Sequence, residues 1–430
     1  MKDLDVVVLG ATGLTGRLVA AHLAARAPET GVRWAVAGRS PQRLADVLTE
    51  VGAPTTPSLV VDLGDEEALR LTASRTHVVL NLAGPYSRTA SAVVAACVAG
   101  GSSYADLSGE VPAVARLVRR RHEPARRAGV RVVPVSGYEA LPADLAVLLA
   151  AQRAEQASRG GAAVDDGPGA GGDVTAVAVT FRTTPPSRRL GLTDAVSGGT
   201  LQSLVEVLAD DDARRAGDPA ALVVDHRAAA AVRRTSPLAL RPRVVGGRVV
   251  GPVVPAAFID PPVLHRTAAL LAEERGEEHR PAALAEGADM GPAGGTVGAV
   301  VLAAAGAGAL LQRGVLAATH LPGPLRRGLA GLLARVLPGS GEGPSADAMT
   351  GWRWQVRAEA LAADGARGTA VVEGVDHPGY AATARMLAEV GLRLAATADD
   401  PPRTGCLTPA LVMAGADGAA GLAAAGVHVS

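Results

Sequence analysis

The order of apolar and polar positions at the start of the chain predicts a βαβ unit. The apolar run Leu4–Leu9 leads directly into a turn with three glycines, Gly10-Ala11-Thr12-Gly13-Leu14-Thr15-Gly16. Residues 17–27 then carry apolar side chains at helical spacing, and residues 33–37 form a second apolar run that ends in Gly38-Arg39-Ser40. Strand, glycine-rich turn, helix and strand in this order are typical of a dinucleotide-binding unit.

Each glycine of this turn is expected at its position for a physical reason. Gly10 allows a tight exit from the strand, Gly13 lets backbone N–H groups approach a pyrophosphate, and Gly16 lets the helix lie close to the sheet. The helix N-terminus supplies unpaired N–H donors for the phosphates. We therefore predict that the three glycines bind the cofactor together with Thr12 and Leu14. Because 52 of 430 residues are glycine, a purely structural turn is the alternative.

The end of the second strand indicates which cofactor is bound. NAD-binding proteins usually place an acid there to accept from the ribose 2′-OH, whereas an arginine accommodates the 2′-phosphate of NADP. This chain has Arg39 and Ser40 and no acid. A guanidinium beside a hydroxyl suits a phosphate dianion, so the sequence favours NADP over NAD. The alternative for Arg39 is a solvated surface arginine.

Further apolar, β-branched runs indicate a parallel sheet. They cover residues 58–63, 76–83 and 131–137 and alternate with helical patterns, which predicts helices on both faces of the sheet. Ligands of such sheets bind outside the carboxyl ends of the strands. Residues that follow those ends are the next cofactor-site candidates: Asp62, Asn81, Gly84 and Tyr86.

The patterns predict an α/β protein in four parts. Residues 1–150 form a Rossmann domain, and residues 151–173, rich in Gly, Ala and Asp, form a mobile linker or loop. Residues 174–376 form a second, mixed α+β domain, and residues 377–430 form a helical C-terminal segment. Within the second domain, residues 290–312 form an uncharged stretch that is long enough to span a bilayer. They are mainly Ala and Gly, so we expect a buried or interfacial helix, with peripheral membrane contact as an alternative.

Composition excludes several classes of function. Lys+Arg and Asp+Glu are each 42 and aromatic residues make up 2%, so nucleic acid is not an expected partner. Lys2 is the only lysine, which excludes a Walker A loop and Schiff-base chemistry. Cys97 and Cys406 form no C-x-x-C motif, and the histidines show no metal-site spacing, so we expect a reducing cytoplasm and no metal.

Short stretches along the whole chain together resemble one family, the saccharopine dehydrogenase-like NADP-binding oxidoreductases, particularly the bacterial trans-acting enoyl reductases. The stretches are Gly10-Ala11-Thr12-Gly13-Leu14-Thr15-Gly16, Ala37-Gly38-Arg39-Ser40, Asn81-Leu82-Ala83-Gly84-Pro85-Tyr86, Tyr104-Ala105-Asp106-Leu107-Ser108-Gly109-Glu110, Ser197-Gly198-Gly199-Thr200, Gly341-Glu342-Gly343-Pro344-Ser345, Pro378-Gly379-Tyr380 and Leu407-Thr408-Pro409-Ala410. The glycine turn is common to many Rossmann proteins, and the later stretches in this order are more specific.

The resemblance implies a Rossmann domain, an α+β domain inserted after it, and a C-terminal segment that returns to the first domain. It also implies NADPH-dependent reduction of an enoyl double bond on a carrier-linked lipid or polyketide chain, in glycolipid assembly. Some relatives associate with membranes or lipid droplets, so peripheral contact with the plasma membrane and a homodimer stay open.

One loop departs from the family pattern. Where the family usually has Gly-Phe-Asp-Ser-x-Pro-Ser-Asp, residues 137–144 read Gly-Tyr-Glu-Ala-Leu-Pro-Ala-Asp. The acid is one methylene longer and two hydroxyl groups are missing, which predicts altered substrate specificity. The lack of lysine beyond Lys2 also removes the acid/base partner that lysine-forming saccharopine dehydrogenases use.

Enoyl reduction needs a proton donor beside the cofactor. Tyr86 and Tyr104 are the first candidates because we expect both to follow strand ends at the cofactor rim; Glu139 and Asp144 are second. The alternatives are tyrosines packed on the nicotinamide or in the core, and acids that are solvated or cap a helix. Three other functions stay open: a related reductase of another substrate, a non-catalytic NADP sensor or scaffold, and a lipid-associated adaptor using residues 290–312.

Overall fold

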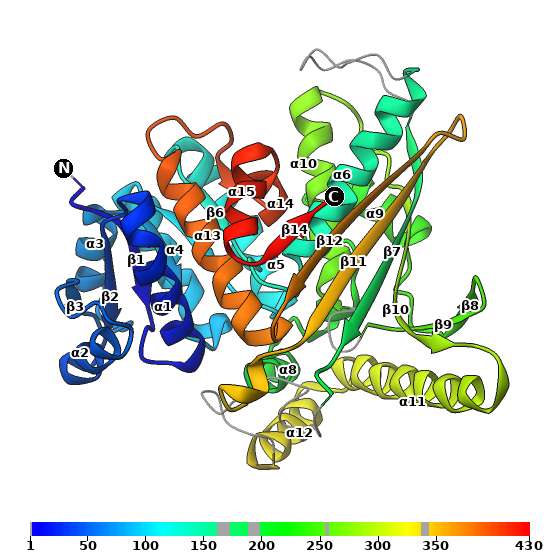
Figure 1. The fold of residues 1–430 in the computed structure, drawn as a ribbon, viewed down its shortest axis with the longest axis horizontal. Helices are drawn as coiled ribbons and strands as arrows, with labels where there is room; N and C mark the ends of the chain where they lie inside the picture. The colour runs from blue at the N-terminus through cyan, green and yellow to red at the C-terminus, as the bar shows by residue number, and fades with distance from the viewer. Residues whose placement is uncertain (1, 161–172, 188–197, 254–257, 337–343) are drawn as a thin grey trace.

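The computed structural model describes residues 2–160, 173–187, 198–253, 258–336 and 344–430, and these residues form two sheets with helices packed on and between them (Figure 1). The first sheet is parallel throughout and has seven strands. Their spatial order is β13 (Gly405–Cys406), β6 (Arg131–Val133), β5 (Ser103–Asp106), β4 (Thr76–Asn81), β1 (Leu4–Leu9), β2 (Trp34–Gly38) and β3 (Ser58–Val60). The order 3-2-1-4-5-6 of the first six strands is that of a Rossmann domain, as predicted, and the strand order reverses between β1 and β4.

Helices cover both faces of this sheet because the buried strands are apolar on both sides. Val6 and Val8 of β1 face one apolar core, and Val7 and Leu9 face the other. The first core is covered by α1 (Leu14–Thr30), α2 (Pro41–Glu50) and α13 (Thr383–Ala396). The second is covered by α3 (Glu66–Arg75), α4 (Tyr86–Gly100) and α5 (Val111–Arg127).

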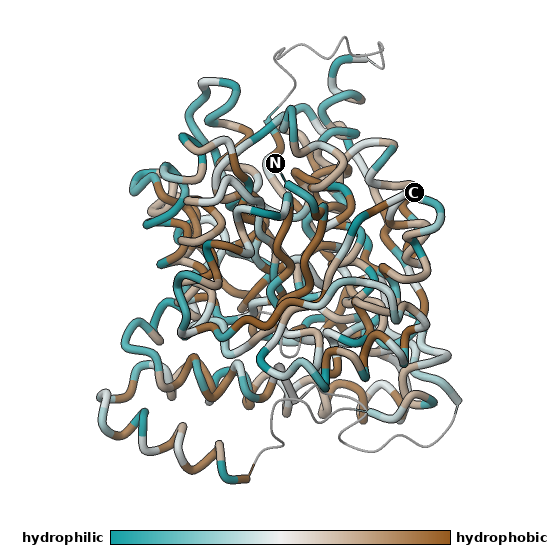
Figure 2. Tube along the Cα trace, turned by 90° about the vertical axis from the view of Figure 1, so that its left-hand side faces the viewer, coloured by the Kyte–Doolittle hydropathy of each residue, from teal (hydrophilic) through white to brown (hydrophobic). Residues whose placement is uncertain are grey.

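The second sheet is mixed and also has seven strands. Its order is β14 (Val427–Val429), β12 (Arg367–Val375), β11 (Arg353–Ala362), β7 (Val174–Thr184), β10 (Ala283–Pro292), β9 (Arg248–Gly251) and β8 (Arg243–Val245). Among the described strands of this sheet, only β7 and β10 pair in parallel. Buried and exposed residues alternate along β11 and β12, since one face packs against the long helix α6 (Leu141–Ser158). Figure 2 shows the apolar segments gathered in the interior of the molecule.

The remaining helices lie around the second sheet and at the C-terminus. They are α8 (Gly198–Ala209), η1 (Ala213–Gly217), α9 (His226–Thr235), α10 (Asp260–Arg275), α11 (Gly295–Thr319), α12 (Gly323–Val336), η3 (Asp347–Met349), η4 (Pro378–Ala382), α14 (Pro409–Met413) and α15 (Ala416–Ala424). The C-terminal part of the chain joins both sheets, because β13 extends the first and β14 the second.

Several expectations differ from the structure. The third strand ends at Val60, not at residue 63, and Tyr104 lies inside β5 instead of following a strand. Helix α6 continues to Ser158, into the predicted linker, because its apolar face packs on the second sheet. Residues 161–172 of that linker, Ser197 and residues 341–343 lie outside the described part of the chain.

The sequence of residues 290–312 predicts a buried or an interfacial helix, and the structure contradicts the buried alternative. Met290 is still part of β10, and α11 runs from Gly295 to Thr319 with most of its surface exposed to solvent. By length and composition alone, it is the one helix in the described residues that could cross a membrane.

Candidate active site

The glycine turn after β1 has the geometry that its sequence predicts. Gly10 has a φ of +86°, and a Cβ there would lie 2.8 Å from the backbone nitrogen of Ala83 in the loop after β4. A Cβ on Gly16 would lie 2.4 Å from the carbonyl oxygen of Gly10. On Gly13, by contrast, a Cβ would come no closer than 3.5 Å to the neighbouring backbone. Gly10 and Gly16 are therefore required by packing, whereas Gly13 leaves space for a ligand.

Helices α1 to α6 each follow a strand of the first sheet and begin at this edge, and α1 and α4, which follow the strands where the order reverses, differ at their N-termini. Helix α4 is capped by Glu110, whose carboxylate accepts from the backbone N–H groups of Tyr86 (2.9 Å) and Ser87 (2.7 Å). Gly13 is the N-cap of helix α1, which has no side-chain cap and no acid in its first turn. Its N–H groups and positive dipole are therefore available to a phosphate.

A cleft of about 520 Å³ runs from this turn to the second sheet domain. Ten of the residues predicted for cofactor binding or catalysis line it: Gly10, Thr12, Gly13, Leu14, Gly16, Arg39, Asp62, Gly84, Tyr86 and Glu139. Arg39 lies at the end of β2 and is exposed, while Asp62 accepts from the backbone N–H of Gly64 at 2.8 Å and shapes the turn before α3. The roles assigned to these residues stay predictions; the structure brings them to one site.

Four other candidates do not line the cleft. Ser40 caps α2, where its hydroxyl accepts from the backbone N–H of Arg43 at 3.3 Å. Asn81 is buried, accepts from the backbone N–H of Ala83 and donates to the Tyr104 hydroxyl at 3.1 Å. It therefore holds the loop after β4 in place rather than facing the ligand space.

Tyr104 and Asp144 are buried structural residues. The Tyr104 side chain is enclosed in the sheet core, and its hydroxyl donates to Asp106 at 2.6 Å. Asp144, at the start of α6, accepts from the Thr267 hydroxyl at 2.5 Å and from the backbone N–H of Ala410 at 2.9 Å. It thereby joins α6, α10 and α14, and burial raises its pKa to about 6.

Tyrosines gather at the far end of the cleft. Tyr86, Tyr138 and Tyr380 line it, which leaves Tyr104 as the only one of the chain's four tyrosines outside. Burial, and to a lesser extent the nearby carboxyl of Asp106, raises the pKa of Tyr86 well above its usual value. Tyr86 therefore keeps its proton at neutral pH and can serve as a donor but not as a base.

The second domain and the C-terminal segment supply residues that sequence reasoning did not assign to the site. Gln202 and Ser203 come from α8, and Gly379, Tyr380 and Thr383 come from η4 and α13. η4 is a single π-helical turn, a feature that is frequent at functional sites. The signal was available, because Pro378-Gly379-Tyr380 and Ser197-Gly198-Gly199-Thr200 are among the stretches that resemble the family.

The C-terminal segment closes the cleft by docking on the loop after β6. The Thr383 hydroxyl accepts from the backbone N–H of Tyr138 at 3.0 Å and donates to the carbonyl of Pro378 at 2.7 Å. A Cβ on Gly137 would lie 2.9 Å from the Thr383 methyl carbon, so this contact requires glycine. The loop that departs from the family pattern is thus part of the cleft wall.

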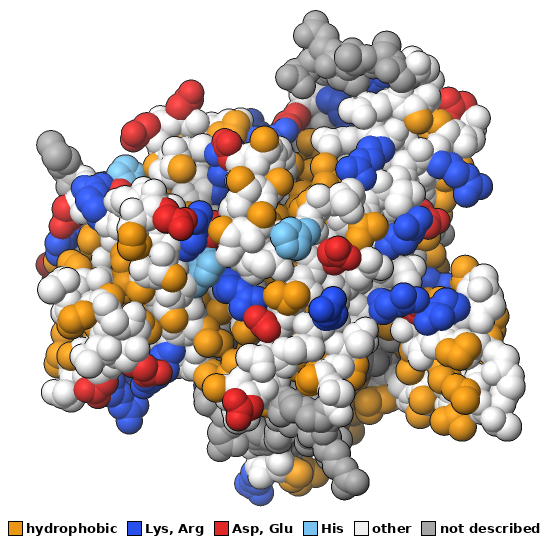
Figure 3. Space-filling view, viewed as in Figure 1, with side chains coloured by type: hydrophobic (Ala, Val, Ile, Leu, Met, Phe, Trp, Pro, Cys, Tyr) orange, Lys and Arg blue, Asp and Glu red, His pale blue; other side chains and the backbone are white. Residues whose placement is uncertain are grey.

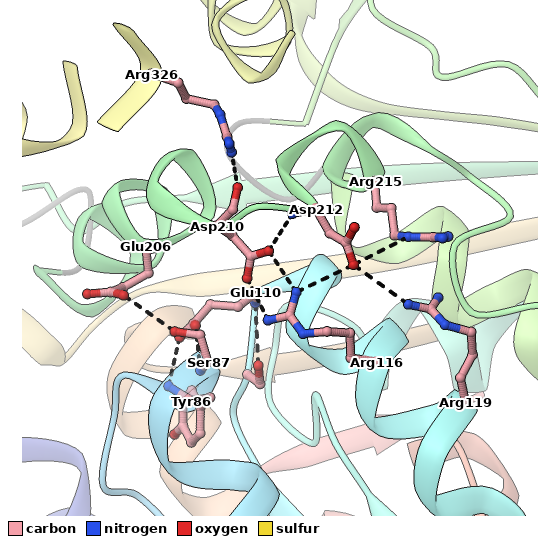
Figure 4. A network of polar contacts seen from close by, with 11 residues as sticks. Tyr86, Ser87, Glu110, Arg116, Arg119, Glu206, Asp210, Asp212, Arg215 and Arg326 are labelled. Carbon is pink, nitrogen blue, oxygen red and sulfur yellow. Dashed lines mark hydrogen bonds and ion pairs between the residues drawn. The ribbon is translucent and has the colours of Figure 1, made fainter. Parts of the chain in front are cut away.

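A polar network fixes α8 against the Rossmann domain (Figure 4). Arg116 of α5 makes a bidentate pair with Asp210, with N–O distances of 2.6 and 2.7 Å. Glu206 of α8 accepts from Arg88 at 3.0 Å and from the Ser87 hydroxyl at 3.4 Å. Because α8 carries Gln202 and Ser203 into the cleft, this network positions that wall.

The fold and the site define a dinucleotide-dependent oxidoreductase with its cleft between two domains. The turn leaves an open cradle at Gly13, the uncapped N-terminus of α1 faces it, and Arg39 stands at the end of β2, so the residues present fit NADP(H). In the described residues no group of three or more His, Cys, Asp or Glu side chains is placed to hold a metal ion.

Comparison with known proteins gives the family. The saccharopine dehydrogenase NADP binding domain matches residues 6–133. Rv2449c of Mycobacterium tuberculosis, named as a candidate trans-acting enoyl reductase, is 34% identical over 425 residues, covering 96% of this chain and 94% of the relative. The trans-acting enoyl reductase of Mycobacterium ulcerans is 31% identical over 429 residues, with the same coverage.

The chain therefore belongs to the saccharopine dehydrogenase-like NADP-binding oxidoreductases, in the branch of the trans-acting enoyl reductases, and it is an NADP(H)-dependent oxidoreductase. Among solved structures, apo saccharopine dehydrogenase (L-Glu forming) from Saccharomyces cerevisiae is similar, with a TM-score of 0.45 and 14% identity over 94% of each chain.

Proposed function

We propose that this protein reduces the carbon–carbon double bond of a carrier-linked 2-enoyl thioester, using NADPH and acting in trans on a chain that another enzyme builds. The observation that carries the proposal is the cleft itself, which joins the predicted phosphate turn to three tyrosines between the two domains. The names of the relatives support the same reaction. The glycolipid context implied by the resemblance stays a prediction.

The residues of the cleft have separate tasks in this reaction. Bound NADPH supplies a hydride for Cβ of the substrate. The turn and Arg39 hold its phosphates, and the walls from α8 and η4 exclude water from the reacting atoms. As Cβ gains the hydride, negative charge develops on the thioester oxygen and Cα must gain a proton. We assign that proton to the Tyr86 hydroxyl, which water then reprotonates.

The position of Tyr86 is set by its backbone. Glu110 is buried and holds the N–H groups of Tyr86 and Ser87, so the first turn of α4 presents the phenol toward the cleft. Glu139 lines the same region and is half-buried. Its charge opposes ionisation of Tyr86 and so helps to keep the proton on the phenol.

The test is NADPH oxidation in the presence of 2-enoyl thioesters, linked to a carrier or to a short soluble thiol. We expect consumption of NADPH and formation of the saturated thioester. Turnover of other acceptors but not of any enoyl thioester would favour a related reductase of another substrate. NADPH binding without transfer to any acceptor would overturn the proposed reaction and favour the sensor or scaffold.

The proton donor is tested by removing one hydroxyl at a time. Tyr86→Phe should lower kcat at least tenfold with little change in NADPH affinity, because the donor acts only in the chemical step. Tyr104→Phe is the matched control, since that hydroxyl is sealed in the sheet core. Equal losses in the two variants, or a loss only in Tyr380→Phe, would refute the assignment to Tyr86.

We also propose that the protein works in the cytoplasm, since its two cysteines are buried and free in the structure. Fractionation of cells that express the full chain tests this location.

A further inference from the structure

Helix α11 buries small and polar side chains against the protein and exposes large apolar ones to solvent. The residues that it buries against β9, β10 and η1 are small or polar: Gly298, Ala305, Ala309, Gln312 and Thr319. Gln312 donates to the carbonyl of Val253 at 2.6 Å within this contact. Leu316 is half-buried and packs on the core, whereas Val297, Val300, Leu302, Leu310 and Leu311 point outward, and Leu310 and Leu311 are 69% and 62% exposed.

Helix α12 continues the same arrangement beside α11. It buries Arg326 and Ala330, whereas Leu325, Leu332 and Val336 are exposed and lie on one stripe at spacings of seven and four residues. We call the exposed large apolar side chains of both helices and of the connection between them the α11–α12 face: Val297, Val300, Leu302, Leu310, Leu311, Leu321, Leu325, Leu332 and Val336. Figure 3 shows the part of this face over α11 as an apolar patch at the lower right.

The charge of this region has one sign. No Asp or Glu occurs between Asp289 and Glu342, whereas four arginines do. Arg326 is turned inward and donates to the carbonyl of Asp210, and Arg327 pairs with Asp211 at 3.2 Å. Arg313 and Arg335 are exposed at the ends of the apolar stripes. Large exposed apolar side chains with only basic charges among them match an anionic lipid surface.

We propose that the α11–α12 face docks on the surface of an anionic phospholipid membrane. A second copy of the chain suits it less well, because a two-fold interface would bring the same unpaired arginines together with no acid between them. A globular partner would cover one side of α11, but apolar side chains cover most of its circumference outside the buried stripe. A lipid leaflet can solvate all of them at once.

The face is connected to the cleft through α8. Val205 and Leu208 of α8 pack on Ala330 of α12 in a small apolar core of their own, and the same helix carries Gln202 and Ser203 into the cleft. Docking would therefore place one wall of the cleft next to the lipid surface. That this serves delivery of an acyl chain rests on the proposed function, whereas the docking itself does not.

Flotation of the full chain with vesicles tests the proposal without cofactor or substrate. We expect the protein to float with vesicles that contain phosphatidylglycerol and to do so less at high salt. Leu310→Asp/Leu311→Asp should lower the partition coefficient at least a hundredfold. Arg313→Gln/Arg335→Gln should lower it about fivefold for each arginine on anionic vesicles and leave neutral vesicles unaffected.

Leu71→Asp is the matched control, because Leu71 is 59% exposed on α3, in the Rossmann domain. It should float like the wild type, and all variants should keep the NADPH affinity and the melting temperature. The proposal is overturned if the wild type does not float, or if the double aspartate variant floats as well as the control. It is also overturned if that variant converts a dimer into a monomer without lipid, which would assign the face to a second copy. Loss of flotation with intact NADPH oxidation leaves the proposed function standing.

Discussion

The glycine turn has two roles, close packing of α1 on the strand and binding of the cofactor phosphates. Adding one methyl group at Gly16 or at Gly13 tests each role separately. In Gly16→Ala the new Cβ would lie 2.4 Å from the Gly10 oxygen, and real contacts stay above 3.0 Å. Helix α1 must therefore move away from the strand by about 0.6 Å. Overpacking of this kind costs about 1–3 kcal/mol, so for a chain of 430 residues we expect the melting temperature to fall by roughly 1–3 °C and NADPH binding to weaken as well.

Gly13→Ala should behave differently. Its Cβ would be 3.5 Å from the neighbouring backbone, and its φ of −75° suits alanine. The lower preference of alanine at an N-cap and the reduced freedom of the unfolded chain act in opposite directions, so stability should change by less than about 0.5 kcal/mol. The methyl group enters the phosphate space and removes a hydrogen bond to a charged group, which weakens NADPH binding by about 1.5 kcal/mol or more, roughly tenfold.

The assay is a fluorescence titration with NADPH beside thermal unfolding of the cofactor-free protein. The two variants should differ in melting temperature and agree in weakened binding. If Gly13→Ala binds NADPH like the wild type, the pyrophosphate does not cross this turn and the cofactor site is misplaced. If Gly16→Ala is as stable as the wild type, the close approach of α1 to the strand does not constrain the turn.

Three further predictions concern selectivity, the wall of the cleft and pH. Arg39→Ala should raise the NADPH dissociation constant at least tenfold and leave NADH unchanged in parallel titrations; equal effects on both would refute a 2′-phosphate role. Arg116→Ala removes both hydrogen bonds to the largely buried Asp210, so urea unfolding should show a loss of about 2 kcal/mol, partly restored in Arg116→Lys. Burial raises the pKa of Asp144 from 3.8 to about 6, so the folded state binds its proton more tightly than the unfolded state, and this group's contribution to stability declines as pH rises through that window. Asp144→Asn should flatten the dependence of the unfolding free energy on pH between 4 and 7. An unchanged slope would contradict a raised pKa of the Asp144 carboxyl in the folded state.

The Rossmann half was predictable because its signals are local. The run Leu4–Leu9, the glycine turn and the following helix each show their pattern within a few residues, and the structure has all three. Tyr104 was misplaced because a tyrosine in a short four-residue strand looks the same in sequence as one that follows a strand. Only the hydrogen bond of its hydroxyl to Asp106, inside the core, shows the difference.

The far wall of the cleft could not be placed from sequence alone. Gln202 and Tyr380 are 178 positions apart; both lie in or just after stretches that resemble the family, but these stretches do not show that the two side chains face the same space. Their meeting depends on pairing within the second sheet and on α13 returning to the first. The structure contradicts only the buried one of the two alternatives for α11, buried or interfacial. The sequence could not decide between them, since a sequence rich in Ala and Gly does not show which of its sides meets the protein.

Residues 377–429 supply parts of both sheets and of the cleft, so this protein can become active only after they have been synthesised. Strand β13 completes the first sheet and helix α13 covers one face of it. Strand β14 forms the edge of the second sheet, and η4 brings Tyr380 to the cleft. On the ribosome, the nucleotide half emerges early yet lacks a cover and a wall until residues 377–429 have also emerged. A nonsense codon anywhere in this final stretch would therefore release a chain with exposed apolar sheet surface, which makes it a substrate for chaperones and proteases rather than a weakened enzyme.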